Sequence, residues 1–101
     1  MVRKRIVVDY KKLSEEIIDQ VKLKYPYGYE DSLITFTNSQ GVFISALPFE
    51  TESVYYLIRM TEEEAREIIE EDSDYDEDGK LRVDFNEEKS NEIKHSDQDD
   101  I

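Results

Sequence analysis

The sequence predicts an α+β fold, in which a small antiparallel or mixed four-stranded sheet carries one or two helices on one side. Short segments of alternating apolar residues and segments of helical periodicity follow one another in the order β-α-β-β-β-α. The apolar residues lie mostly before position 61, and acidic residues dominate the remainder. We therefore expect one folded module of about 70 residues, followed by an acidic segment.

The first strand and the first helix carry clear local signals. Residues 5–10 alternate between apolar and polar positions and are rich in β-branched side chains, which predicts a strand. Ser14 is the expected N-cap of the helix, because its hydroxyl can accept a hydrogen bond from the first turn. Pro26 cannot continue a helix, so the helix is expected to end just before it.

Three more strands are expected at residues 33–37, 42–47 and 54–60. The sequence Asn-Ser-Gln-Gly at residues 38–41 predicts a hairpin turn, because glycine tolerates a positive φ. Pro48 has no backbone N–H to donate, so it ends the strand before it or marks an edge of the sheet.

A capping box begins the last helix, with Thr61 as N-cap and Glu64 as its reciprocal partner. Ala65, Ile68 and Ile69 form the apolar face of this helix. Across the module, the residues on the apolar phase of each element are the expected core: Ile17, Val21, Phe36, Ile44, Ile58 and Ile69.

Charge divides the chain into two parts. Residues 1–60 contain eight basic and eight acidic residues, whereas residues 61–101 contain 18 acidic and 5 basic ones and so carry the whole net charge of −13. We expect residues 1–71 to form the folded module and residues 72–101 to form an acidic, largely disordered tail, because the tail has too few apolar residues to offset the entropy of ordering. The exception is residues 81–85, which alternate like a short strand that could add to a sheet edge.

Composition excludes several classes of function. The chain has no cysteine, so it has no disulfide framework, thiolate zinc site or thiol nucleophile, and a cytoplasmic location is expected. No apolar run approaches the ~20 residues that span a bilayer. Its charge repels nucleic acid and anionic membranes, so we expect a basic protein surface as partner, with no direct nucleic acid, no membrane and no small molecule.

Half of a calcium-binding loop is present. Asp74, Asp76, Asp78 and Gly79 match positions 1, 3, 5 and 6 of an EF-hand, but Phe85 stands where the bidentate carboxylate should be. We therefore expect only weak calcium affinity and predict no dedicated metal or cofactor site.

Tyrosines are concentrated in the sequence Tyr-Pro-Tyr-Gly-Tyr at residues 25–29. Tyr25, Tyr27 and Tyr29 could form a docking patch, because tyrosine offers a large contact area and a polar tip. Alternatively, the same rings could close one end of a thin core. Both interpretations stay open at the level of sequence.

Basic residues are concentrated near the start of the chain. They could form a footprint for nucleic acid, or the acidic tail could fold back onto them. The residues concerned are Arg3, Lys4, Arg5, Lys11, Lys12, Lys22 and Lys24.

Catalysis is not expected. The single histidine, His95, lies in the polar tail, and the three glycines are too far apart for a phosphate loop. The carboxylates are numerous but are expected to be exposed, which makes them poor general acids at neutral pH.

Three stretches carry a recognisable pattern: Arg-Ile-Val-Val-Asp-Tyr at residues 5–10, Lys-Tyr-Pro-Tyr-Gly-Tyr at 24–29 and Val-Tyr-Tyr-Leu-Ile at 54–58. Together with the acidic tail, they resemble a family of small acidic uncharacterised bacterial proteins, some of which are labelled "DNA primase". This chain lacks the zinc-binding cysteines and the strand-end carboxylates that such an activity needs. The resemblance implies at most an association with replication or transcription machinery. The architecture is also similar to that of the delta subunit of some bacterial RNA polymerases.

We therefore expect a non-catalytic, cytoplasmic interaction or regulatory protein whose acidic tail engages a basic partner surface. One alternative is a rigid acidic inhibitor or DNA mimic of a basic enzyme, and another is a weak calcium-binding module. An ordered acidic segment would favour the inhibitor. The residues expected to contact a partner are Tyr25, Tyr27, Tyr29, Asp74, Asp76 and Asp78.

Overall fold

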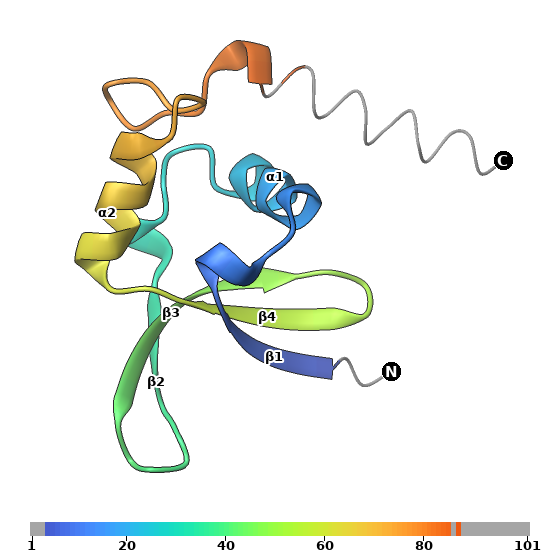
Figure 1. The fold of residues 1–101 in the computed structure, drawn as a ribbon, viewed down its shortest axis with the longest axis vertical. Helices are drawn as coiled ribbons and strands as arrows, with labels where there is room; N and C mark the ends of the chain where they lie inside the picture. The colour runs from blue at the N-terminus through green and yellow to red at the C-terminus, as the bar shows by residue number, and fades with distance from the viewer. Residues whose placement is uncertain (1–3, 86, 88–101) are drawn as a thin grey trace, which may run out of the picture.

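The computed structural model describes residues 4–85 and 87, which form a four-stranded mixed sheet with two α-helices on one face (Figure 1). The predicted α+β class and the order β-α-β-β-β-α are confirmed. The elements are β1 (Lys4–Asp9), α1 (Glu15–Lys24), β2 (Ile34–Thr37), β3 (Phe43–Glu50), β4 (Val54–Arg59) and α2 (Glu62–Glu71), with 3-10 turns at Tyr10–Lys12 and Glu30–Ser32.

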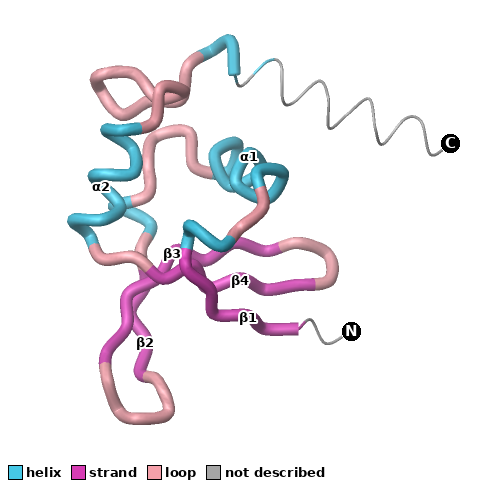
Figure 2. The backbone as a smooth tube through the Cα atoms, viewed as in Figure 1, coloured by secondary structure: helices cyan, strands magenta, loops and turns pink. Residues whose placement is uncertain are grey.

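The strands lie in the order β1-β4-β3-β2. The sheet is mixed because β1 runs parallel to β4, whereas β4, β3 and β2 form an antiparallel meander. Helix α1 lies over β4 and β1, α2 stands beside it at the left of the view, and the β2–β3 hairpin extends away from both helices (Figure 2). No helix in the described part of the chain is long and apolar enough to cross a bilayer.

Both predicted helix starts are confirmed by side-chain caps. The Ser14 hydroxyl accepts a hydrogen bond from the Ile17 N–H at 3.2 Å. Thr61 and Glu64 exchange two hydrogen bonds of 3.0 Å, which complete the capping box of α2. Such caps satisfy backbone donors that would otherwise lack a partner in the first turn.

The predicted hairpin turn is also present between β2 and β3. The Asn38 side-chain oxygen accepts hydrogen bonds from the backbone N–H groups of Gln40 and Val42, at 2.9 and 3.0 Å. Gly41 has a φ of 79°, which an L-residue adopts only with strain.

Pro48 lies within β3 and does not end it. The pairing of β2 with β3 stops at Ile34 opposite Ala46, so Pro48 has a strand neighbour only on the side of Leu57 in β4. Its missing N–H is therefore harmless, as at a sheet edge. Its carbonyl accepts a hydrogen bond from the Tyr25 hydroxyl, which ties the end of α1 to the sheet.

Three of the six predicted core residues are buried: Val21, Ile58 and Ile69. The other three are only half-buried: Ile17, Phe36 and Ile44. Phe36 and Ile44 face each other across β2 and β3. Because side chains alternate along a strand, Ile44 and the core residue Leu47 point to opposite faces of the sheet. Phe36 and Ile44 therefore lie on the face away from the helices, where Arg5 approaches the Phe36 ring at 5.9 Å.

The sequence predicted that the folded module ends with α2, but the core extends beyond this helix. Tyr75 and Leu81 are only 4% and 8% exposed and belong to the same apolar cluster as Ile58 and Ile69. The prediction of a short strand at residues 81–85 is wrong. Within this segment only Leu81 forms a bridge, to Tyr75, and residues 83–85 are helical. The rest of the predicted tail, residues 88–101 with His95, lies outside the described residues.

Leu81→Ala should lower the free energy of unfolding by about 2 kcal/mol or more, because it leaves a cavity in the core. Val83→Ala is the matched control, since Val83 lies two positions further along and is 68% exposed; its effect should stay within about 0.5 kcal/mol. Urea denaturation of both variants checks this. Equal small effects would mean that the core is complete without residues after position 71.

Candidate functional site

Two loops meet at one end of the helices. The tyrosine loop, residues 25–29, follows α1, and the aspartate loop, residues 72–82, follows α2. Each turns at a glycine in the left-handed region, Gly28 with a φ of 96° and Gly79 with a φ of 79°. Both glycines lie over the Ile69 side chain of α2, so the two turns share one apolar floor.

The aspartate loop is closed by its own backbone. Tyr75 and Leu81 form an antiparallel bridge, and the Asp76 N–H donates to the Lys80 carbonyl at 2.8 Å. The Arg82 N–H donates to the Asp74 carbonyl, also at 2.8 Å. The loop is therefore a compact hairpin-like unit and not an extended tail.

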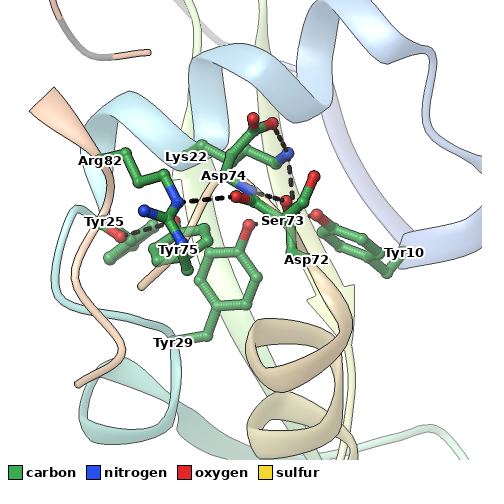
Figure 3. Close-up of polar contacts among 9 residues, drawn as sticks. All are labelled: Tyr10, Lys22, Tyr25, Tyr29, Asp72, Ser73, Asp74, Tyr75 and Arg82. Carbon is green, nitrogen blue, oxygen red and sulfur yellow. Dashed lines mark hydrogen bonds and ion pairs between the residues drawn. The ribbon is translucent and has the colours of Figure 1, made fainter. Parts of the chain in front are cut away.

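Backbone hydrogen bonds join the aspartate loop to the tyrosine loop. The Leu81 N–H donates to the Pro26 carbonyl at 2.6 Å, and the Tyr75 hydroxyl donates to the Tyr25 carbonyl at 2.9 Å. Figure 3 shows Tyr75 beside Tyr25 and Tyr29 at this junction. These contacts use main-chain groups of the tyrosine loop that α1 leaves without helical partners.

Tyr29 is fully buried and lies at the centre of an aromatic cluster. Its ring centroid lies 5.7 Å from that of Tyr10, 6.1 Å from Tyr25 and 6.2 Å from Tyr75. Its hydroxyl lies 3.1 Å from the Tyr10 hydroxyl, which satisfies the polar tip.

The tyrosine loop therefore serves mainly to pack the core. Tyr29 cannot contact a partner in this fold, and half-buried Tyr25 uses its hydroxyl within the chain, so the expectation of three partner-contacting tyrosines is too broad. Tyr27 is different, because it is 78% exposed and projects from the turn.

Lys22 of α1 is buried, with 7% of its surface exposed. Its ammonium nitrogen lies 2.6 Å from Asp72 Oδ2 and 2.8 Å from Asp74 Oδ2 (Figure 3). The Phe85 ring centroid lies 5.2 Å from the same nitrogen. Lys22 is one of the basic residues near the start of the chain. Its contacts with Asp72 and Asp74 show that part of the acidic segment folds back onto these basic residues, which is one of the two alternatives given above.

Burial alone would lower the pKa of Lys22, but hydrogen bonds from the ammonium to Asp72 and Asp74, together with their charge, outweigh it and raise that pKa. Burial also raises the pKa of Tyr10, Tyr25 and Tyr29. The pKa of Tyr29 shifts most because its hydroxyl is the most deeply buried, and the neighbouring Tyr75 and Tyr10 add to the shift.

The three aspartates predicted to contact a partner do not converge. Asp74 pairs with Lys22, and Asp76 accepts hydrogen bonds from the N–H groups of Asp78 and Lys80 at 2.9 and 3.0 Å. These backbone donors, that of Lys80 first, lower the pKa of Asp76. Among the described residues, no group of three or more histidine, cysteine, aspartate or glutamate side chains is arranged to hold a metal ion. The geometry therefore gives no support to the calcium-binding alternative.

An acidic cleft of about 470 Å³ lies between the two loops and α2. Tyr29, Ala65 and Ile69 contribute to its apolar lining, and exposed Tyr27 stands at its side. One base, Arg66, lines it and is held by Glu30 at 3.2 Å. Six acidic residues surround the cleft: Glu30, Asp31, Glu70, Asp76, Glu77 and Asp78.

Three of the residues that line this cleft are among the predicted partner contacts, and their contact with a partner stays a prediction. Tyr27, Asp76 and Asp78 were expected to contact a partner, and all three line it. Glu30 and Glu70 were not expected, because they come from separate segments that only the fold brings together. The acidic first turn at Glu30–Ser32 directly after the tyrosine loop was the signal available.

Most of the acidic charge belongs to the folded part of the chain. Of the 18 acidic residues after position 60, 12 lie at positions 62–84, on α2, the aspartate loop and the turn after it. A second cleft, of about 890 Å³, lies between the end of β1 and α2, and its five acidic lining residues are partly balanced by Lys11, Lys12 and Arg59.

Comparisons with known proteins produced no match: no family model, no curated protein and no solved structure is significantly similar to this chain.

Stability should fall as the pH rises above about 10, the ordinary pKa of tyrosine. The raised pKa values of Lys22, Tyr10, Tyr25, Tyr29 and Tyr75 mean that the unfolded chain loses these protons before the folded chain does. Thermal melting by circular dichroism, with tyrosinate absorbance at each pH, checks this. Ionisation of all seven tyrosines without loss of the folded signal would contradict the buried cluster.

Proposed function

We propose that this protein is a non-catalytic interaction protein whose folded acidic face binds the basic surface of a protein partner. The observation that carries the proposal is the cleft with six carboxylates, in which the one lining base is already paired with Glu30. A cationic side chain entering this cleft would meet uncompensated negative charge. The residues described in the structure include no histidine or cysteine that could serve as a catalytic base or nucleophile.

The cleft also suits an extended basic side chain by shape. The floor includes Ala65 and Ile69, on which the methylene groups of lysine or arginine can pack. Tyr27 supplies an exposed ring at the side, and a ring face attracts a cation. Several such contacts are needed, because each exposed ion pair contributes only about 0.2–1 kcal/mol.

The distribution of charge on α2 supports the same proposal. Glu62, Glu63 and Glu64 in its first turn favour the helix dipole. Glu70 and Glu71 at its other end oppose the dipole, and no base in the last turn compensates them. Residues that lower the stability of their own helix without stabilising the fold are typical of a functional surface. Glu70 is such a residue, and it lines the cleft.

A second candidate is a rigid acidic inhibitor or DNA mimic of a basic enzyme. The position of 12 acidic residues on folded segments, and not on a free tail, favours it over a purely electrostatic tail. The two functions differ in their partner: a DNA mimic abolishes the activity of the enzyme that it binds, whereas an interaction protein engages a surface that performs no chemistry.

A fluorescently labelled nonalysine peptide is a suitable probe. Affinity should fall steeply as salt rises from about 0.1 to 1 M, because the Debye length shrinks from about 10 to 3 Å. Glu70→Gln with Glu77→Gln should weaken binding on the order of three- to ten-fold relative to the matched double variant Glu16→Gln with Glu52→Gln. All four side chains are exposed, and only the first two line the cleft.

Both double variants remove two negative charges, so net charge cannot explain a difference between them. Equal weakening would show that the acidic residues act only through net charge, and the proposal would be overturned.

A further inference from the structure

The ammonium group of Lys22 occupies a site built from the acidic segment. Its two ionic contacts, at 2.6 and 2.8 Å, are to Asp72 and Asp74, and the Phe85 ring lies 5.2 Å away. Two carboxylates and an aromatic ring are the groups that bind a cationic side chain from any source. Lys22 therefore holds, within the chain, carboxylates that a basic partner would also recognise.

Lys22 differs in this from its neighbours. Lys24, in the last turn of the same helix, is exposed, and so are Lys11 and Lys12 in the turn before α1. The Lys22 side chain is 9% exposed and that of Asp72 is 15% exposed, whereas Asp74 remains 39% exposed. An incoming cation can therefore reach Asp74 while Lys22 is still bound, and exchange can begin there.

Replacing one ammonium by another changes little chemically. The carboxylates keep a partner, so no buried charge is left unpaired, and the released Lys22 side chain gains water. The intramolecular contact has a high effective concentration, in the millimolar range for short connections. Only a partner with several cationic groups should displace it. The cleft supplies the additional contacts, because Asp76, Glu77 and Asp78 belong to the same loop as Asp74.

The aspartate loop can leave as a unit. Its internal bridge between Tyr75 and Leu81 and its backbone hydrogen bonds do not depend on α1. Besides Lys22, the hydrogen bonds that hold it to the tyrosine loop are those from Leu81 to Pro26 and from Tyr75 to Tyr25, together with apolar packing. Loss of the Lys22 contact therefore weakens the attachment of the loop, whereas complete opening would also expose Tyr75 and Leu81.

We propose that Lys22 is an autoinhibitory latch: it holds Asp72 and Asp74 in cis, and a polybasic partner displaces its ammonium group and weakens the attachment of the aspartate loop to the core. This inference depends on the proposed function, because it names how the same acidic face is regulated. Displacement makes Asp72 and Asp74 available to the partner, in addition to the carboxylates of the cleft.

The direct test is hydrogen–deuterium exchange of the full chain with and without nonalysine. Binding should accelerate exchange of the Leu81 amide, which donates to Pro26 across the two loops, and should leave the amides of the sheet protected. Peptide binding with unchanged or slower exchange of the loop overturns the latch and leaves the proposed function intact. Failure of the peptide to bind overturns both.

Two pairs of matched variants test the role of Lys22 itself. Lys22→Met should raise nonalysine affinity about ten-fold more than Lys24→Met, because both remove one positive charge and only the first removes the competitor. Lys22→Arg should lower affinity relative to Lys24→Arg, because a guanidinium binds carboxylates more firmly than an ammonium does. The arginine variants keep the positive charge that pairs with Asp72 and Asp74 and so preserve the fold. They therefore test the proposal even if Lys22→Met does not fold. Equal affinities within the arginine pair would overturn the proposal.

Discussion

The burial of Tyr29 is the constraint on which the other features depend. Its ring contacts Tyr10 from the end of β1, Tyr25 from the end of α1 and Tyr75 from the aspartate loop. A phenol can be buried only if its ring is surrounded and its hydroxyl is paired. In so small a core, three distant segments supply that enclosure, so the aspartate loop is part of the packing and not an appendage.

This constraint explains why the acidic charge is held in place. A segment with many like charges would by itself remain extended, because repulsion and chain entropy oppose its folding. Burial of Tyr75 and Leu81 opposes that tendency, and Lys22 forms ion pairs with Asp72 and Asp74. The remaining carboxylates face the cleft beside Tyr27, where a partner can compensate their charge. While Lys22 is bound, Asp72 and Asp74 serve the fold, and Asp76, Glu77 and Asp78 remain at the cleft.

Sequence reasoning succeeded where structure is local. The caps at Ser14 and Thr61 and the turn at Gly41 depend on neighbours within a few residues, and all three are confirmed. It failed for Tyr75 and Leu81. Residues 72–101 contain few apolar side chains, and this low number cannot reveal that two of them pack into a core formed by distant segments of the chain. The cleft was not predicted for the same reason: its aspartates are close in sequence, whereas Glu30 joins them only through the fold.

The most direct test of the account is the backbone mobility of the aspartate loop in the intact chain, measured by 15N relaxation. A loop packed on Tyr29 and Lys22 should have order parameters near 0.85, like the strands of the sheet. Values below about 0.6 across residues 72–82 would show a mobile acidic tail and contradict both the shared core and the rigid acidic face.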